Sequence, residues 1–218
     1  MANDLDELVP QFLTIATGNI SDALFELGIE PCSVPGPTAL VPGQPRFAGP
    51  AFTVQQRAKG NPAGPGRTRQ LEVIDAIAAP GDVIVIDVGG RTDVCTLGGL
   101  LALRAKARGL AGFLVNGCVR DAADIAASEF PVHCLGTAPR KSSVELETAS
   151  IGEPVQIGGR RIAPGDLIVC DDTGAVMVPH EAAERVLTRA REIQRREEAV
   201  VSRVESGMSL HDAFRIAQ

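Results

Sequence analysis

The sequence predicts an α/β fold in a single domain, residues 1–218, with a long helix near its C-terminal end. Three observations support this prediction. Apolar runs typical of buried strands alternate with helical patterns between residues 79 and 178. Two of these runs, residues 79–87 and 163–171, are nearly identical. Residues 181–206 carry a narrow apolar stripe among alternating charges, which is typical of a half-solvated helix.

The N-terminal part of the chain predicts two short helices followed by loops. Apolar residues at helical spacing in residues 5–13 indicate the first helix. Ser21 is expected to cap a second helix that ends at Gly28. Residues 31–65 are rich in Pro and Gly, so we expect loops wrapped around an edge strand at Ala51–Val54.

The segment Lys59–Thr68 has no apolar anchor, and we expect it to be mobile unless something binds it. A plain flexible loop is the simpler interpretation, and a lid on the substrate side is the alternative. A helix is predicted next, over Gln70–Ala78.

The two nearly identical runs each read Ala-Pro-Gly-Asp followed by an apolar strand. They suggest two pseudo-equivalent strands that cross one core, although Pro-Gly-Asp is also common turn chemistry. The pattern between and after them predicts an alternation of helices and strands, namely helix Leu97–Arg108, strand Gly112–Asn116, helix Ala122–Ala127, strand Val132–Leu135 and strand Ala175–Val178.

Composition narrows the function classes. The formal net charge is −6 and the aromatic content 3%, without a separate basic cluster, so no nucleic-acid partner is expected. The absence of a signal-peptide pattern and of a bilayer-length apolar run predicts a cytoplasmic protein without membrane contact. The five Cys lack CxxC spacing and are expected to be free and mostly buried, and the three His lack zinc-ligand spacing. No GxGxxG motif indicates a dinucleotide cofactor.

The residues that carry chemistry lie around the helix predicted to start near Leu97. Gly98 and Gly99 open this helix, so the unpaired amides near Leu100 and Leu101 favour an anion. Beyond the strand Gly112–Asn116, Gly117 is expected to allow a tight turn that places Arg120 and Asp121 at the end of that strand.

Arg120 offers a bidentate fork for a carboxylate, and Asp121 offers a hard oxygen ligand for Mg²⁺ or Mn²⁺. The alternative is that both residues merely cap the following helix, because Asp is ordinary at a helix N-terminus. The paired Asp171 and Asp172 before Thr173 and Gly174 are interpreted as a turn.

These residues also resemble a known family. Gly98-Gly99, Lys106–Gly109, Gly112 and Asn116–Asp121 closely resemble the RraA-like family, which includes 4-hydroxy-4-methyl-2-oxoglutarate and 4-carboxy-4-hydroxy-2-oxoadipate aldolases. The resemblance extends over most of the chain outside the 59–68 segment, and further matching segments are Ser21–Leu24, Gly49–Val54, Pro80–Asp82 and Pro164–Asp166.

The resemblance implies a swivelling β/β/α layered domain that forms a homotrimer or hexamer. It implies that Arg120 holds the pyruvyl carboxylate, that amides of the turn at Gly99, Leu100 and Leu101 contact the pyruvyl group, and that Asp121 ligates the divalent metal. The long C-terminal helix is expected to contact a neighbouring subunit and to contribute a metal-site carboxylate there, from Glu197 or Glu198.

One position departs from the family's aldolases, because Gly99 stands where they carry an acidic residue, and this leaves the outer shell of the metal one charge poorer. The implied activity is metal-dependent C–C cleavage of a 2-oxo acid through a metal-stabilised enolate, either retro-aldol release of pyruvate or oxaloacetate decarboxylation. Two alternatives stay open: a non-catalytic regulator of a ribonuclease, and a related hydroxy-acid or sugar-acid lyase.

Overall fold

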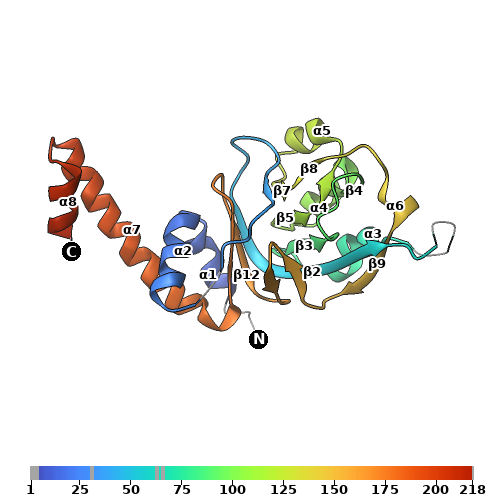
Figure 1. The fold of residues 1–218 in the computed structure, drawn as a ribbon, viewed down its shortest axis with the longest axis horizontal. Coiled ribbons are helices and arrows are strands. Elements are labelled where there is room, and N and C mark those ends of the chain that lie inside the picture. The colour runs from blue at the N-terminus through green and yellow to red at the C-terminus, as the bar shows by residue number, and fades with distance from the viewer. Residues whose placement is uncertain (1–4, 30–31, 62–63, 65–66, 218) are drawn as a thin grey trace.

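A curled sheet forms the body of the protein, and one long helix projects from it (Figure 1). The computed structural model describes residues 5–29, 32–61, 64 and 67–217. The projecting helix is α7 (Ala183–Glu205), which carries α8 (Leu210–Ala217) at its far end. The predicted helix over residues 181–206 is confirmed, apart from an initial 3-10 turn at His180–Ala182, whereas α8 was not predicted.

The main sheet has eight strands and mixes parallel and antiparallel pairs. The strand order is β1-β7-β5-β3-β2-β12-β13, with β9 also paired to β2. Strands β2, β3, β5 and β7 are mutually parallel neighbours, and the others are antiparallel to their partners. The bounds are β1 Thr38–Ala39, β2 Phe47–Ala58, β3 Val83–Asp87, β5 Gly112–Asn116, β7 Val132–Cys134, β9 Leu146–Ile151, β12 Leu167–Cys170 and β13 Ala175–Val178.

Strand β2 is central, so the prediction of an edge strand at Ala51–Val54 is wrong. The first four residues of β2 pair with β12, residues 51–55 pair with β3, and residues 54–58 pair with β9. Pro50 suggested an edge because proline removes a ladder donor. In the fold, Pro50 lies where pairing with β12 stops and pairing with β3 starts, so the missing N–H falls at a break between two ladders.

The two Pro-Gly-Asp turns have the same geometry, which confirms the predicted equivalence. In each turn the Asp carboxylate, of Asp82 or Asp166, accepts a 2.8 Å hydrogen bond from the amide three residues earlier. Gly81 and Gly165 have φ angles of 89° and 87°, a left-handed conformation that glycine adopts without strain. The strands that follow, β3 and β12, both pair with β2.

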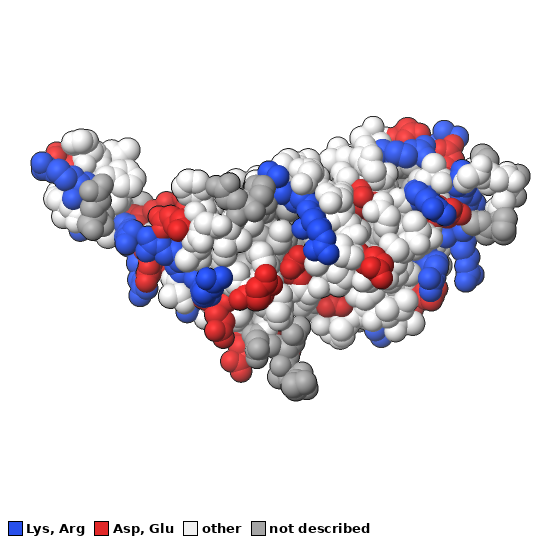
Figure 2. All heavy atoms as spheres, turned by 60° about the horizontal axis from the view of Figure 1, so that its bottom comes forward, with Lys and Arg blue, Asp and Glu red and all other residues white. Residues whose placement is uncertain are grey.

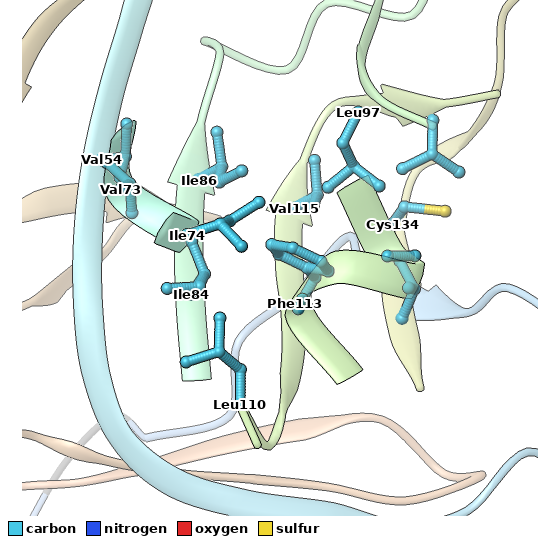
Figure 3. Packing of buried hydrophobic residues seen from close by; sticks show 14 of the residues in the cluster. Val54, Val73, Ile74, Ile84, Ile86, Leu97, Leu110, Phe113, Val115 and Cys134 are labelled. Atoms are coloured by element: carbon cyan, nitrogen blue, oxygen red, sulfur yellow. The ribbon is translucent and has the colours of Figure 1, made fainter. Parts of the chain in front are cut away.

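Alternating side chains of these strands fill cores on both faces of the sheet. Ile84 and Ile86 of β3 lie beside Val73 and Ile74, which follow α3 (Gln70–Glu72), as Figure 3 shows. Residues of α4 (Gly99–Ala107) and α5 (Ala122–Ala127) belong to the same core. Val83 and Val85 point to the other face, toward the hairpin of β10 (Val155–Ile157) and β11 (Arg160–Ile162). This period of two produces a layered structure with buried side chains on both faces.

A third core joins α1 (Leu5–Phe12), α2 (Thr17–Glu26) and α7 to β12 and β13. Helix α2 starts at Thr17, so the prediction that Ser21 caps it is wrong, and Ser21 lies inside the helix. A distant side chain binds the helix start instead: Asp171 accepts hydrogen bonds from the Thr17 amide at 2.9 Å and from its hydroxyl at 2.7 Å. The predicted end at Gly28, with φ of 68°, is confirmed.

Three short strands form a second, parallel sheet with the order β4-β6-β8. Their bounds are Cys95–Leu97, Cys118–Val119 and Gly136–Thr137. The helix predicted from Leu97 therefore starts only at Gly99, because Leu97 still belongs to β4. The helix predicted over Gln70–Ala78 consists of α3 followed by a π-helical turn, Val73–Ile77, and a further short helix is α6 (Ser142–Glu145).

All five cysteines are buried and none is part of a disulfide within the described residues, in agreement with the sequence prediction. His133 lies in the core against Phe47, at a centroid distance of 5.4 Å, and His180 and His211 are exposed. Among the residues that the structure describes, no helix combines the length and apolarity needed to cross a membrane. Acidic and basic side chains lie interspersed on the face drawn in Figure 2. The expectation of no nucleic-acid partner stays a prediction.

Buried His133 predicts a specific acid sensitivity. Burial lowers its pKa to about 4, with partial opposition from the charge of Asp171. The unfolded state takes up a proton below about pH 6.5, whereas the folded state does so only near pH 4, so this contribution to stability is lost as pH falls through that window. We expect His133→Leu to abolish roughly 2 to 3 kcal/mol of the destabilisation between pH 7 and pH 4.5, measured by urea unfolding.

The matched control is His211→Leu, which removes an exposed imidazole and should leave the pH dependence of unfolding as in the wild type. If His133→Leu and the wild type lose the same free energy of unfolding between pH 7 and pH 4.5, another group controls the acid sensitivity.

Candidate functional site

The candidate site lies where two neighbouring strands pass into helices. Strand β4 leads through Gly98 into α4, and β6 leads through Arg120 and Asp121 into α5. Because β4 and β6 are parallel neighbours, their carboxyl ends lie side by side. The Arg120 amide donates a 3.0 Å hydrogen bond to the Leu97 carbonyl, which holds the two turns together.

The prediction that Arg120 and Asp121 end the strand Gly112–Asn116 needs correction. That strand is β5 of the main sheet, whereas the pair follows β6 in the second sheet. Gly117 separates the two strands, and a Cβ added there would lie 2.0 Å from Cγ2 of Val88. Glycine is therefore required by close packing, and its φ is not in the left-handed region.

Asp121 directs its carboxylate toward the start of α4 instead of capping its own helix. Its backbone is left-handed, with φ of 56° and ψ of 43°, and its side chain makes no capping hydrogen bond to α5. Its Oδ2 accepts a 3.2 Å hydrogen bond from the Gly99 amide and lies 3.5 Å from Nε of Arg120. The interpretation of this pair as a simple helix cap is therefore wrong for the Asp121 side chain. A left-handed non-glycine residue is typical of functional sites.

The three candidate amides at the start of α4 differ in availability. The Gly99 amide binds Asp121, and the Leu101 amide donates to the Gly98 carbonyl at 3.0 Å. Within the described part of the chain, the Leu100 amide has no hydrogen-bond partner, so it is the donor left free for an anion. The expectation for Leu100 fits this geometry better than those for Gly99 and Leu101.

Two glycines make room for this arrangement. A Cβ at Gly98 would lie 2.5 Å from Oδ2 of Asp121 and 2.9 Å from Cγ of Arg120. A Cβ at Gly99 would lie 2.9 Å from Cβ of Asp124, whose Oδ2 would be 3.5 Å away. The exposed carboxylate of Asp124 thus stands beside the position where a side chain at residue 99 would begin, which sequence spacing did not reveal.

A cavity of about 420 Å³ opens over these residues. Two of its lining residues, Gln70 and Thr96, belong to a buried polar chain that no sequence motif indicated. Gln70 donates to both the carbonyl and the hydroxyl oxygen of Thr96, at 2.9 and 3.0 Å, and the Thr96 hydroxyl donates to Gln56 at 2.6 Å. The lining residues are Arg67, Thr68, Gln70, Leu71, Cys95, Thr96, Leu97, Gly98, Leu100, Leu101, Arg120, Asp121, Lys141, Ser142 and Ser143.

The segment Lys59–Thr68 reaches this cavity at its end, through Arg67 and Thr68. Lys59 donates from Nζ to the Ser143 carbonyl at 2.9 Å. Residues 62–63 and 65–66 lie outside the described residues, so the predicted mobility and the lid alternative stay predictions.

The carboxylates expected from a neighbouring subunit do not join the site within one chain. Glu197 and Glu198 lie on α7, which projects away from α4 and α5 (Figure 1). Glu197 accepts a 2.7 Å hydrogen bond from Asn19, and Glu198 accepts one of 3.1 Å from Gln194. Both line a separate cavity of about 460 Å³ between α2 and α7.

The fold and the site define a mixed α/β protein with an Arg–Asp pair at a helix N-terminus. A family model described as RraA-like, Aldolase/RraA, matches residues 17–177. The chain belongs to the RraA-like family. This confirms the family predicted from its sequence motifs.

Relatives of the chain carry both enzyme and inhibitor names. A protein of Halalkalibacterium halodurans, provisionally named 4-hydroxy-4-methyl-2-oxoglutarate aldolase, is 36% identical over 198 residues, or 88% of this chain and 86% of that protein. An uncharacterized protein from Pseudomonas syringae pv. tomato has a TM-score of 0.85 at 30% identity, covering 95% and 96% of the two chains. RraAS2 of Streptomyces coelicolor, described as an unusual member of the RNase ES inhibitor RraA protein family, has a TM-score of 0.78 at 34% identity, covering 88% and 94%.

The close approach at Gly98 predicts a local effect of substitution. In Gly98→Ala the added methyl group displaces Asp121, so the hydrogen bond from the Gly99 amide is lost. We expect the Gly99 amide to exchange about tenfold faster, the scale of one lost hydrogen bond, in residue-resolved hydrogen exchange. Gly18→Ala is the control, because a Cβ there meets nothing within 4 Å. Unchanged exchange in Gly98→Ala would contradict the described contact.

Proposed function

We propose that this protein is a divalent-metal-dependent lyase that cleaves a C–C bond of a 2-oxo acid and releases pyruvate. The observation that carries the proposal is the Arg120 and Asp121 pair, whose side chains meet at the start of α4 without capping α5. The aldolase name of a relative at 36% identity supports the same class of reaction. Oxaloacetate decarboxylation is proposed as a second reaction of the site, because it develops the same negative charge on the 2-oxo oxygen.

The donor set fits Mg²⁺ or Mn²⁺ better than a structural zinc ion. Among the described residues no group of three or more His, Cys, Asp or Glu side chains could hold a metal ion. A zinc site needs three or four such ligands, whereas Mg²⁺ is commonly held through one or two carboxylates together with waters and substrate oxygens. Asp121 provides one such carboxylate at the cavity wall.

The chain's own residues would bind and orient the substrate. The Arg120 guanidinium and the free Leu100 amide would hold the carboxylate of the 2-oxo acid, and the positive end of α4 would add to their attraction. Asp121 would hold the cation beside that carboxylate. A bound divalent cation would supply Lewis-acid stabilisation of the charge that develops on the 2-oxo oxygen. The Gly99 contact holds the Asp121 carboxylate in place before substrate binds.

We further propose that Asp124 supplies the outer-shell charge that Gly99 lacks. Its carboxylate is exposed in the first turn of α5, and no hydrogen bond or ion pair engages it within the described residues. The 2.9 Å approach to a Cβ at residue 99 means that side chains at 99 and 124 compete for one space. An acidic group can therefore occupy this space from either helix, but not from both at once.

We propose a head-to-tail homotrimer, which can pair into a hexamer, as the functional assembly. Apolar side chains are exposed beside the cavity, Leu71, Leu100 and Leu103, and others are exposed along the projecting arm, Val201, Val204, Leu210, Phe214 and Ile216. Two different apolar surfaces at opposite ends of one chain suit a heterologous contact that closes into a ring. That contact would bring Glu197 or Glu198 of a neighbour toward Asp121. A monomeric species in sedimentation at micromolar concentration would contradict it.

A non-catalytic regulator of a ribonuclease is the second candidate, favoured by the likeness to RraAS2 of Streptomyces coelicolor. Inhibition of a ribonuclease, together with no pyruvate release, would support it over the lyase. A hydroxy-acid or sugar-acid lyase that uses the same pair stays a further alternative.

The central test is pyruvate release from 4-hydroxy-4-methyl-2-oxoglutarate and from oxaloacetate, with Mg²⁺ and with chelator. After subtraction of the release that occurs without protein, we expect release only with the metal, and a loss of at least about a hundredfold in Asp121→Asn, the scale of removing one electrostatic stabiliser. Asp6→Asn, on the exposed side of α1, is the matched control and should keep full activity. Protein-dependent release that persists in chelator, or no protein-dependent release from any 2-oxo acid, would overturn the lyase proposal.

The role of Asp124 has a test that needs no turnover. We expect Asp124→Asn to weaken Mn²⁺ binding about tenfold, measured from the spin-resonance signal of free Mn²⁺, because the outer-shell charge is lost. Glu129→Gln, beyond the C-terminal end of α5, is the control. In the double variant Gly99→Asp/Asp124→Gly the acidic side chain comes from position 99 and position 124 leaves room for it. The Mn²⁺ affinity of this variant should return to within a few fold of the wild type. Unchanged affinity in Asp124→Asn would exclude the role.

A further inference from the structure

Three of the five cysteines gather at the second sheet, whose strands lead into the candidate site. Cys95 lies on β4 and Cys118 on β6, and Cys134 ends β7 two residues before β8 begins at Gly136. All three are buried. Among the described residues no group of three His, Cys, Asp or Glu side chains could hold a metal ion, so these thiols do not form a metal site. Bond formation between two thiols is the chemistry that this arrangement leaves.

Cys95 and Cys118 are direct partners across β4 and β6. The two strands are parallel, and their register pairs these two residues. Side chains of paired residues lie on the same face of a sheet, and neighbouring strands lie about 4.8 Å apart. A disulfide spans Cα separations of about 4.4 to 6.8 Å. The register therefore places the two residues within the range that a disulfide can bridge.

Cys134 is placed differently from this pair. Its side chain belongs to the apolar core that Figure 3 shows, to which neither Cys95 nor Cys118 belongs. Its thiol donates to the Gly136 carbonyl at 3.4 Å, and burial raises its pKa to about 11. Gly136 is also the partner of Cys118 on β8, and a Cβ added there would lie 3.8 Å from the Cys118 Sγ. The missing side chain leaves the Cys118 thiol room to turn toward β4.

The cavity over the site gives access to one of the two thiols. Cys95 lines this cavity of about 420 Å³, so a small molecule can reach its thiol without unfolding of the chain. Burial raises the pKa of the Cys95 thiol, and the charge of Arg120 and an amide hydrogen bond from Ser142 partly oppose the rise. Burial also raises the pKa of Cys118. Both thiols therefore react slowly, and the closeness of the second thiol decides which product forms.

We propose that Cys95 and Cys118 are an oxidative modification site, at which a peroxide that enters the cavity links the two strands by a reversible disulfide. The Cys95 sulfur attacks hydrogen peroxide, the O–O bond breaks, and a sulfenic acid forms while the thiol proton leaves with the first water. The Cys118 sulfur then attacks the Cys95 sulfur, the S–S bond forms, the S–O bond breaks and a second water leaves. The thiols lose two electrons and two protons, and the peroxide is reduced to water.

The disulfide would act on the candidate site through both strands. Cys95 lies three residues before Gly98, and Cys118 lies two residues before Arg120. A disulfide holds its two Cβ atoms about 3.8 Å apart, which is closer than the spacing of neighbouring strands. The bond would draw the ends of β4 and β6 together, where Gly98 already lies against Asp121. Oxidation is therefore expected to displace the Gly98 turn relative to the Asp121 carboxylate.

The test treats the wild type with a small excess of hydrogen peroxide, blocks the remaining thiols and maps disulfides by mass spectrometry after trypsin digestion. Cys95, Cys118 and Cys134 fall in three different tryptic peptides, because Arg104 and Arg120 separate them. We expect one linked species, which joins the peptides of Cys95 and Cys118 and disappears with dithiothreitol. Cys95→Ala and Cys118→Ala should each remove this species, whereas the control Cys134→Ala should keep it.

A second measurement follows the effect on the site. The Gly99 amide should exchange about tenfold faster in the oxidised protein than in the reduced protein, the scale of one lost hydrogen bond to Asp121, and dithiothreitol should reverse the change. Unchanged exchange in a fully linked sample would overturn this effect. Retention of all thiols, a link between Cys118 and Cys134, or oxidation of Cys95 without a link would overturn the disulfide. Neither measurement depends on lyase activity, so a failure of the proposed function is distinguishable from a failure here.

Discussion

The architecture depends on the pairing of β2 along its whole length. This one strand holds β12 at its start, β3 along its middle and β9 at its end, so it joins the parallel and antiparallel parts of the sheet. The two Pro-Gly-Asp turns lie against β2. The contact is so close that a Cβ at Gly49 would lie 2.1 Å from the Gly81 carbonyl oxygen. All three cores receive side chains from β2, namely Val54, Ala48 and Ala51. A change in the register of β2 would shift every layer at once.

The site depends on a second, smaller constraint, which is the contact between two strand-to-helix turns. Strands β4 and β6 have only three and two residues, yet their parallel register sets the Gly98 turn against Arg120 and Asp121. Glycine at position 98 removes the atom that would separate the turns, and the left-handed backbone of Asp121 directs its carboxylate across the gap. Chemistry and packing therefore share the same few atoms, and the site has little tolerance for larger side chains.

The sequence predicts features that arise from local chemistry. The two Pro-Gly-Asp turns, the long amphipathic helix and the glycine at the end of α2 follow from short-range rules, and the structure confirms each of them. The pair Arg120 and Asp121 is equally visible, because a strand, a turn and a helix follow in sequence. Its strand was placed incorrectly, since two-residue β6 is too short to produce a pattern.

The features that sequence reasoning missed depend on residues far apart in the chain. Pro50 suggested an edge strand because no local signal shows that two ladders meet there. Asp124 comes close to Gly99 only through the packing of α5 on α4, and the polar chain of Gln70, Thr96 and Gln56 joins three separate elements. Ser21 fits the local rule for a cap, but tertiary contacts start α2 four residues earlier.

The contact between Asp171 and Thr17 reaches further than its two hydrogen bonds. Burial alone would raise the pKa of Asp171, but hydrogen bonds from Thr17, Thr173 and Gly174 outweigh it and lower the pKa below its ordinary value. The first turn of α2 obtains this acceptor only after 154 further residues have been made. During synthesis from the N-terminus, α2 therefore leaves the ribosome early but is completed late. Helix α2 is thus among the first segments to be synthesised, but its first turn is stabilised only after the segment that contains Asp171 has been made.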